Sequence, residues 1–343
     1  MRLLHRVRVL SLAVLLAACG GGGEDRIPRR SWAWVDVPGA ECADGSPTGI
    51  GVSRGDDDAR VVLFLDGGGA CWDAVTCFQL RTASPGPFGA AQLSARLAEL
   101  PGSALDRTLP GNPWAGATLV FVPYCTGDVH AGDAVQDYPG APRSWRHHGR
   151  ANVEAALDWL AANLPAPGQV VVSGASAGGF GALLAFDRAA GRWPAARAYL
   201  VDDSGPPLVG DDFSPVLRAA WFAAWRLDRT LLPICPDCAL DLSALLPVLA
   251  RAHPGARLAL LSSRQDQVIR GYVGLGPAGF EAALLRLVDG RVAPLAQARA
   301  FLVPGEGHTL LGAPGTFTSG GVPLLEWLRR MVEDDPAWTT AGR

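Results

Sequence analysis

The segment VVVSGASAGGFGALLAF (170–186) places a serine where a strand-like run turns into a helix-like run. Ser176 is flanked by Gly174, Gly178 and Gly179, and a nucleophile elbow needs such small neighbours because its backbone turns sharply. The G-x-S-x-G pattern is weak by itself in a chain with 42 glycines. A serine hydroxyl becomes reactive only beside a neutral histidine that an acid orients. Ser176 is therefore a candidate nucleophile if both partners follow it.

The candidate general base is His308, in VPGEGHTLL, directly after the last predicted strand. The chain has six histidines, and of these only His253 and His308 follow Ser176. His253 lies in ARAHPGAR at the end of a helix-like run, which is typical of a surface helix terminus. The order serine, acid, histidine is that of α/β-hydrolases, so we expect His308 to serve Ser176.

The candidate acid is Asp266, in LLSSRQDQVIRG, after the next-to-last predicted strand. Asp202 and Asp203, in LVDDSG, follow the preceding strand and remain an alternative, because the acid of a triad can be supplied from either strand. We expect Asp266 to orient His308.

An anionic intermediate needs backbone N–H groups aimed at one point. Ala177 follows the candidate nucleophile and supplies one of them. The glycine triplet in LFLDGGGACW follows an early predicted strand, where this fold places its oxyanion loop. Gly68 and Gly69 are therefore the other candidate donors.

The segment YCTGDVHAGD follows the second predicted strand and should reach the same edge of the sheet. Asp128 and His130 have a spacing that suits a metal pair, but no third ligand is apparent. We expect Asp128 to tie the loop and His130 to lie near the substrate, with Trp72 and Tyr124 also in the pocket. No metal and no cofactor is expected.

Short apolar runs alternate with helical patterns along the chain, which predicts a doubly wound, mostly parallel sheet with helices on both faces. The predicted strands are 59–66, 117–124, 169–174, 196–203, 256–263 and 298–305, and the predicted helices lie near 88–100, 149–164, 177–190, 241–252, 277–288 and 320–332. The aromatic segment within 205–240 is either an inserted helical cap or a plain crossover with extra core aromatics. The fold class is α/β-hydrolase-like, in one domain over 32–338.

Composition limits the function. The 343 residues are 49% hydrophobic with a formal net charge of −3, which argues against binding nucleic acid. All 30 basic residues are arginine, and the absence of lysine excludes a Schiff-base lysine, a serine–lysine dyad and a Walker P-loop.

The first residues form a targeting segment. Three arginines precede the apolar run VLSLAVLLAA, which ends in LLAAC and resembles a bacterial lipobox. We expect residues 1–18 to be a signal peptide, Cys19 to be lipidated, and 19–31 to be a flexible tether. The alternative is an ordinary secretory signal peptide. Either way the protein is expected to be exported, and with the lipid it would be a membrane-anchored lipoprotein of the outer membrane or cell surface.

The six other cysteines are an even number, which indicates disulfides in an exported chain. Spacing favours Cys71 with Cys77, and Cys235 with Cys238; Cys42 with Cys125 follows only by elimination. The CPDC motif could also suggest a redox or zinc site, but no second CxxC accompanies it. The Cys71–Cys77 bridge would brace the loop of the oxyanion glycines.

Six segments occur here in one order: LDGGGACWD, VPYCTGDVHAG, HHGRANVEAALDWL, GASAGGFGA, SRQDQVIRG and GEGHTLL. Together they resemble the pectin acetylesterase/Notum family of serine esterases over about residues 32–334. The resemblance implies a triad of Ser176, Asp266 and His308, and an oxyanion hole from Gly68, Gly69 and Ala177. Many relatives carry tryptophan beside the oxyanion glycines, where this chain has Ala70.

The sequence therefore predicts a serine esterase that hydrolyses O-acyl esters. The acyl group expected is acetyl, and the expected substrate is an acylated polysaccharide. The protein is expected to be a monomer. Two alternatives remain. One is an inactive surface protein that binds glycan or lipid, and the other is a depolymerase or esterase for long acyl chains.

Overall fold

All six predicted strands are present in the computed structural model, which describes residues 27–343. They are parallel to one another and form a continuous part of one sheet. The strands are β3 (Asp57–Leu65), β4 (Ala117–Val122), β7 (Gln169–Ala175), β8 (Arg197–Asp203), β9 (Arg257–Ser263) and β10 (Ala298–Val303).

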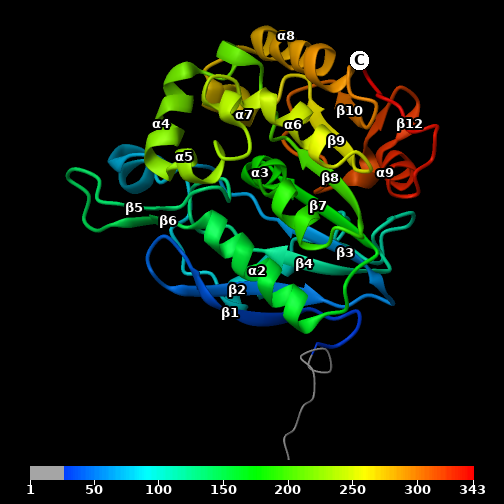
Figure 1. Cartoon of the computed structure of the whole chain (residues 1–343), viewed down its shortest axis with the longest axis horizontal. Coiled ribbons are helices and arrows are strands. Elements are labelled where there is room, and N and C mark those ends of the chain that lie inside the picture. The colour runs from blue at the N-terminus through cyan, green and yellow to red at the C-terminus, as the bar shows by residue number, and fades with distance from the viewer. Residues whose placement is uncertain (1–26) are drawn as a thin grey trace, which may run out of the picture.

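Two further strands, which the sequence pattern does not reveal, extend one edge of the sheet. These are β1 (Ala33–Glu41) and β2 (Pro47–Ser53), and both pair antiparallel. The order across the sheet is β1-β2-β4-β3-β7-β8-β9-β10 (Figure 1). β1 contains a Pro-Gly pair and a register shift between Asp36 and Glu41. Proline and glycine normally indicate a turn, which hides this edge strand in the sequence.

Helices cover both faces of the sheet, as predicted. The helices are α1 (Ala90–Leu97), α2 (Gly149–Asn163), α3 (Ala177–Arg192), α4 (Pro215–Trp225), α5 (Leu227–Thr230), α6 (Leu245–Ala252), α7 (Gln267–Val273), α8 (Pro277–Leu287) and α9 (Leu324–Val332). Short turns of 3₁₀ or π helix and two small two-stranded ribbons, β5–β6 and β11–β12, complete the described chain. β5 (Ala134–Gln136) and β6 (Trp145–His147) form a hairpin that projects at the left of Figure 1.

Alternate residues of the central strands enter two different cores. Val170 and Val172 of β7 pack with α2, α3, α4, α6 and α8, whereas Val171 packs on the other face with α1 and α9. Because both faces are buried, a strand needs apolar residues at successive positions. This requirement explains why the central strands read as continuous apolar runs.

The segment between β8 and β9 contains α4, α5 and α6. Three of its aromatic residues, Phe213, Trp221 and Trp225, are buried in the same core as the sheet. Trp221 packs on Trp225 with ring centroids 4.4 Å apart and meets Phe213 edge-on at 5.1 Å. The aromatic segment is therefore anchored in the main core, and its helix α4 stands beside the carboxyl edge of the sheet (Figure 1).

Three disulfides form, two of them the pairs that spacing favours and the third the pair left by elimination. Cys42 bonds Cys125, Cys71 bonds Cys77 and Cys235 bonds Cys238. The interpretation of CPDC as a redox or zinc motif is not needed, because Cys235 and Cys238 are fully buried and bonded to each other.

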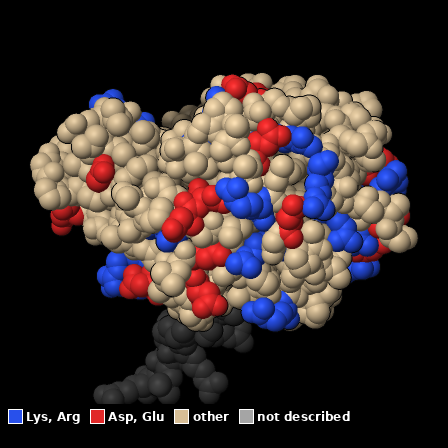
Figure 2. Space-filling view, turned by 90° about the horizontal axis from the view of Figure 1, so that it is seen from above, with Lys and Arg blue, Asp and Glu red and all other residues tan. Residues whose placement is uncertain are grey.

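The predicted signal peptide 1–18, Cys19 and most of the predicted tether lie outside the described residues. Within 27–343 no helix is long and apolar enough to cross a membrane. Arginines and carboxylates are interspersed on the face that Figure 2 shows, so that face carries no field of a single sign.

Candidate active site

Ser176 lies at a strained turn between β7 and α3. Its backbone has φ 61° and ψ −120°, which a non-glycine residue rarely adopts. The chain around it is too tight for side chains, since a Cβ on Gly178 would lie 1.9 Å from the carbonyl oxygen of Leu65. The Ser176 hydroxyl has no hydrogen-bond partner among residues 27–343 and lines an apolar pocket. A turn of this shape presents the hydroxyl to a ligand.

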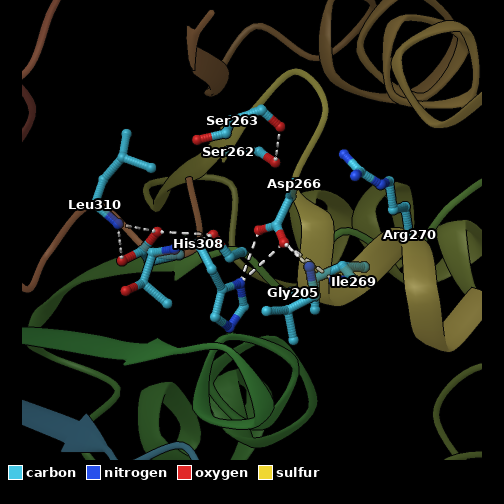
Figure 3. A network of polar contacts seen from close by, with 12 residues as sticks. Gly205, Ser262, Ser263, Asp266, Ile269, Arg270, His308 and Leu310 are labelled. Carbon is cyan, nitrogen blue, oxygen red and sulfur yellow. Dashed lines mark hydrogen bonds and ion pairs between the residues drawn. The ribbon is translucent and has the colours of Figure 1, made fainter. Parts of the chain in front are cut away.

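Asp266 and His308 are in direct contact (Figure 3). The Nδ1 atom of His308 lies 2.8 Å and 3.0 Å from the two carboxylate oxygens of Asp266. Asp266 is fully buried, whereas the His308 side chain is 20% exposed. A neutral His308 that donates from Nδ1 carries its lone pair on Nε2, which is the atom that accepts a proton in a triad.

Asp203 does not contact the His308 ring through a hydrogen bond but holds the loop that follows it. Its carboxylate accepts the N–H of Leu310 at 2.8 Å and of Leu311 at 2.7 Å (Figure 3 labels Leu310). Its carbonyl oxygen accepts the N–H of Ser176 at 2.8 Å. Burial raises the pKa of Asp203 to about 6. One residue thus ties the serine turn to the histidine loop.

The alternative acid Asp202 and the alternative base His253 make contacts away from the Asp266–His308 pair. Asp202 is buried, accepts the N–H of Gly205 at 2.8 Å, and its pKa is raised to about 8 by burial. His253 ends α6 and places Nε2 2.9 Å from Asp187. Neither side chain is hydrogen-bonded to His308.

The glycine triplet 67–69 runs beside the serine turn. A Cβ on Gly67 would lie 3.1 Å from Cβ of Ser176. Gly69 has φ 82° and a bridge to Ala83, and a Cβ on it would lie 1.8 Å from the carbonyl oxygen of Thr82. Ala177 is the first residue of α3, where a backbone N–H has no acceptor within the helix. The loop and the helix start therefore meet at Ser176.

His130 supports this loop from behind. Its Nε2 lies 2.9 Å from the carbonyl oxygen of Asp66, the residue before the glycine triplet. The ring stacks obliquely on Tyr124, whose own ring contacts the position of Gly68. His130 is only 2% exposed, and burial lowers its pKa to about 4. The imidazole is therefore neutral at pH 7 and donates from Nε2.

Asp128 ties the loop in which His130 lies, as the sequence suggests. Its carboxylate accepts the hydroxyl of Thr126 at 2.6 Å and the N–H groups of Gly149, Gly132 and His130 at 2.7, 3.1 and 3.2 Å. Burial raises the pKa of Asp128, and these four donors oppose that rise. Val129 and His130 both have left-handed backbones, which this network holds in place.

The pocket beside Ser176 is apolar and narrow, with a cavity volume of about 20 Å³. Its walls come from the glycine loop after β3, from the loop after β4, from helices α3 and α7, and from α4 with the residue Phe213 that precedes it. Besides Ser176 and Ala177 they include Gly69, Ala70, Val129, Phe180, Phe213, Leu217, Trp221, Ile269, Tyr272 and Val273.

The expected pocket residues lie mostly behind these walls. Asp128 and His130 are buried and do not line the pocket; Val129 between them does. Tyr124 is also buried, with its hydroxyl 2.9 Å from the N–H of Val129. Trp72 is half-buried and meets Tyr272 edge-on at 6.4 Å. His130 was expected near the substrate; its Nε2 is bonded to the Asp66 carbonyl, and its side chain does not line this pocket.

Sequence reasoning missed Tyr272 and the helix α7 that presents it. The sequence does contain a signal for this helix, because aspartate at 266 is a typical N-cap residue and glycine at 274 is a typical residue after a helix. In the structure Asp266 caps α7, and Gly274 ends it with φ 76°. Among residues 27–343 no group of three or more His, Cys, Asp or Glu side chains is placed to hold a metal ion.

The chain has the α/β-hydrolase-like fold, with the serine turn after the central strand β7 and a histidine after the last strand. The family can be stated more narrowly. A family model described as "Pectinacetylesterase" matches residues 34–219, just over half of the chain, and the chain belongs to that family. The match includes Ser176 and ends before Asp266 and His308.

Proteins of similar sequence support this family assignment. The palmitoleoyl-protein carboxylesterase NOTUM of Drosophila melanogaster is 27% identical over an alignment of 247 residues that covers 64% of this chain and 34% of the relative. An inactive palmitoleoyl-protein carboxylesterase, notum1b of Danio rerio, is 32% identical over an alignment of 101 residues that covers 26% of this chain and 65% of the relative. The chain thus spans about a third of the length of the NOTUM relative.

A solved structure, the Wnt deacylase Notum from Drosophila, superimposes with a TM-score of 0.69. The superposition covers 92% of this chain and 96% of the other, at 20% sequence identity. At that identity the likeness concerns the fold.

Proposed function

We propose that the protein is a serine carboxylic ester hydrolase that removes short O-acyl groups. Ser176 attacks the ester carbonyl while His308 Nε2 takes the hydroxyl proton and returns it to the leaving alcohol. Water then attacks the acyl-enzyme, with His308 again as base, and releases the carboxylic acid. Asp266 holds His308 in the tautomer that these two reaction steps require, with the proton on Nδ1.

The observation that carries this proposal is the Asp266–His308 contact at the edge where Ser176 turns out of the sheet. We assign the stabilisation of the developing oxyanion to backbone N–H groups of Gly68, Gly69 and Ala177, because the glycine loop runs beside the serine turn and Ala177 begins α3. Removal of one such donor costs about 2.7–4 kcal/mol of transition-state stabilisation in other enzymes. No cofactor is required for this chemistry.

The narrow pocket favours a small acyl group. The cavity, about 20 Å³, is small, and its walls are aliphatic and aromatic side chains. The methyl of an acetyl group fits such a space, whereas a long chain needs the aromatic walls to move. An acetylated polysaccharide is the substrate class that we propose first, in accord with the family.

A second candidate is a binding protein that no longer hydrolyses esters, and the inactive relative from Danio rerio is the observation in its favour. A binder has no need of a buried carboxylate that contacts a histidine, or of a serine held in a strained turn. A third candidate, an esterase for long acyl chains, is favoured by the aromatic lining of the pocket but not by its width.

The test is hydrolysis of p-nitrophenyl esters from acetate to dodecanoate. The wild-type protein should prefer acetate and butyrate, and Ser176→Ala should lose activity while its melting temperature is unchanged. Residual turnover above about a thousandth of wild type would contradict Ser176 as the nucleophile. No turnover of any ester by the wild type would favour the binding protein.

We also propose that the protein is exported and anchored to a membrane through lipid on Cys19, and that it acts as a monomer. The support is the lipobox-like LLAAC sequence and the three disulfides, which form in oxidising compartments.

A further inference from the structure

Tyr272 connects three parts of the site that the chain supplies from distant segments. It lies near the end of α7, and that helix begins at Asp266. The Oδ1 atom of Asp266 accepts the N–H groups of Val268 at 2.9 Å and Ile269 at 3.0 Å. The same carboxylate that contacts His308 therefore fixes the start of the helix that carries Tyr272.

The hydroxyl of Tyr272 lies on the oxyanion loop. It accepts the N–H of Ala70 and donates to the carbonyl oxygen of Thr82, both at 3.3 Å. Thr82 in turn donates its hydroxyl to the carbonyl of Ala70 at 2.6 Å. A Cβ on Gly69 would lie 2.9 Å from the Tyr272 oxygen, so the hydroxyl and the loop are in close contact. Burial raises the pKa of Tyr272, which keeps the hydroxyl protonated and able to donate.

The ring of Tyr272 fills pocket space that the small side chain of Ala70 leaves open. Ala70 is small and buried, and both Ala70 and Tyr272 line the pocket beside Ser176. Trp72 supports the ring from the side. The phenol of Tyr272 therefore forms one wall of the pocket and contacts the glycine loop at Gly69 and Ala70.

We infer that Tyr272 is a specificity-determining and positioning residue: its ring limits the length of the acyl group, and its hydroxyl fixes the oxyanion loop at Ala70. This inference rests on the proposed esterase function. It assigns the preference for short acyl groups to a residue outside the Ser176–His308–Asp266 set.

Two substitutions separate the ring from the hydroxyl. Tyr272→Phe keeps the ring and loses two long hydrogen bonds, so kcat should fall about three- to tenfold for every ester, with the chain-length preference unchanged. Tyr272→Ala opens the pocket. Each methylene that gains buried contact should then favour the longer ester by about fourfold.

The experiment measures kcat and KM for p-nitrophenyl acetate, butyrate, hexanoate and octanoate with the purified mature protein. The matched control is Tyr199→Phe, since the Tyr199 hydroxyl bonds Asp334 at 2.9 Å on the β8 strand, away from the pocket. It should keep the wild-type kcat and the wild-type ratio of octanoate to acetate. Melting temperatures of all variants check that they fold.

We expect the octanoate-to-acetate ratio of kcat/KM to rise at least tenfold in Tyr272→Ala and to stay within twofold in Tyr272→Phe. An unchanged ratio in folded Tyr272→Ala would overturn the role of the ring. A wild-type kcat in Tyr272→Phe would overturn the role of the hydroxyl. If the wild type hydrolyses none of these esters, the proposed function itself fails. If the wild type is active but the Tyr272 variants keep its kcat and its chain-length preference, only the role of Tyr272 fails.

Discussion

Replacing His130 with leucine should destabilise the protein in a way that depends on pH. The imidazole is buried and its Nε2 donates to the carbonyl of Asp66, 2.9 Å away. Leucine is similar in size but cannot donate, so it leaves that carbonyl without its partner. A buried polar group without a partner costs about 1–3 kcal/mol. We expect His130→Leu to lose this amount of unfolding free energy at pH 7.5.

The pH dependence follows from the pKa of His130, which is about 4 in the folded protein against 6.5 for a free histidine. Because the unfolded chain binds a proton more readily, acid favours unfolding, and stability falls as the pH drops from about 6.5 towards 4. At pH 5 the loss is about 2 kcal/mol, from 1.5 pH units at 1.36 kcal/mol each. The leucine variant lacks this loss, so its stability deficit should shrink by about 2 kcal/mol between pH 7.5 and pH 5.

The assay is urea unfolding of wild type and variant at both pH values with disulfides intact. Tyr124→Phe is the matched control, because its hydroxyl accepts the N–H of Val129 in the same loop at 2.9 Å. Burial holds the pKa of Tyr124 well above its usual value, so its deficit should be equal at the two pH values. A His130→Leu deficit that does not change with pH would refute the buried, neutral imidazole.

Three further changes test other parts of the account. Asp266→Asn should lower turnover of p-nitrophenyl acetate roughly 10⁴-fold, whereas Asp203→Asn should mainly cost about 1–3 kcal/mol of stability; the reverse order would make Asp203 the acid. Replacing both Cys71 and Cys77 with serine should lower the free energy of unfolding by about 2 kcal/mol, since the disulfide closes a loop of sequence separation 6, and should also lower turnover. Unaltered turnover would contradict the role of this disulfide in bracing the glycine loop. Cys19→Ala should move the protein from the membrane fraction to the soluble fraction, and a variant that stays with membranes would contradict lipid anchoring.

The sequence predicts the central sheet well because buried parallel strands need apolar residues on both faces. β7 and β9 are found at the predicted places for that reason. The edge strand β1 was missed because one of its faces is partly exposed and a Pro-Gly pair interrupts it. β1 therefore lacks the continuous apolar pattern that identifies the parallel strands.

The residues that follow the strands were predictable because carboxyl ends of parallel strands meet at one edge. Ser176, Asp266 and His308 were chosen by this rule, and the structure brings the last two into contact. The bonds of Asp203 to the backbone of Leu310 and Leu311 were not predictable, since they depend on how two loops fold back on each other.

The pocket walls were the least predictable part. Trp221 and Tyr272 reach the pocket from helices whose positions depend on tertiary packing rather than on local sequence. His130 was expected near the substrate because it follows a central strand. Its ring bonds the Asp66 carbonyl and does not line the pocket beside Ser176.

The central claim is that Ser176 is an activated nucleophile, and covalent labelling tests it most directly. A fluorophosphonate probe should modify the purified wild-type protein once, on the tryptic peptide that contains Ser176, as read by mass spectrometry. Ser176→Ala should remain unlabelled at the same melting temperature. A folded wild-type protein that takes no label, or a label found on another residue, would contradict the account.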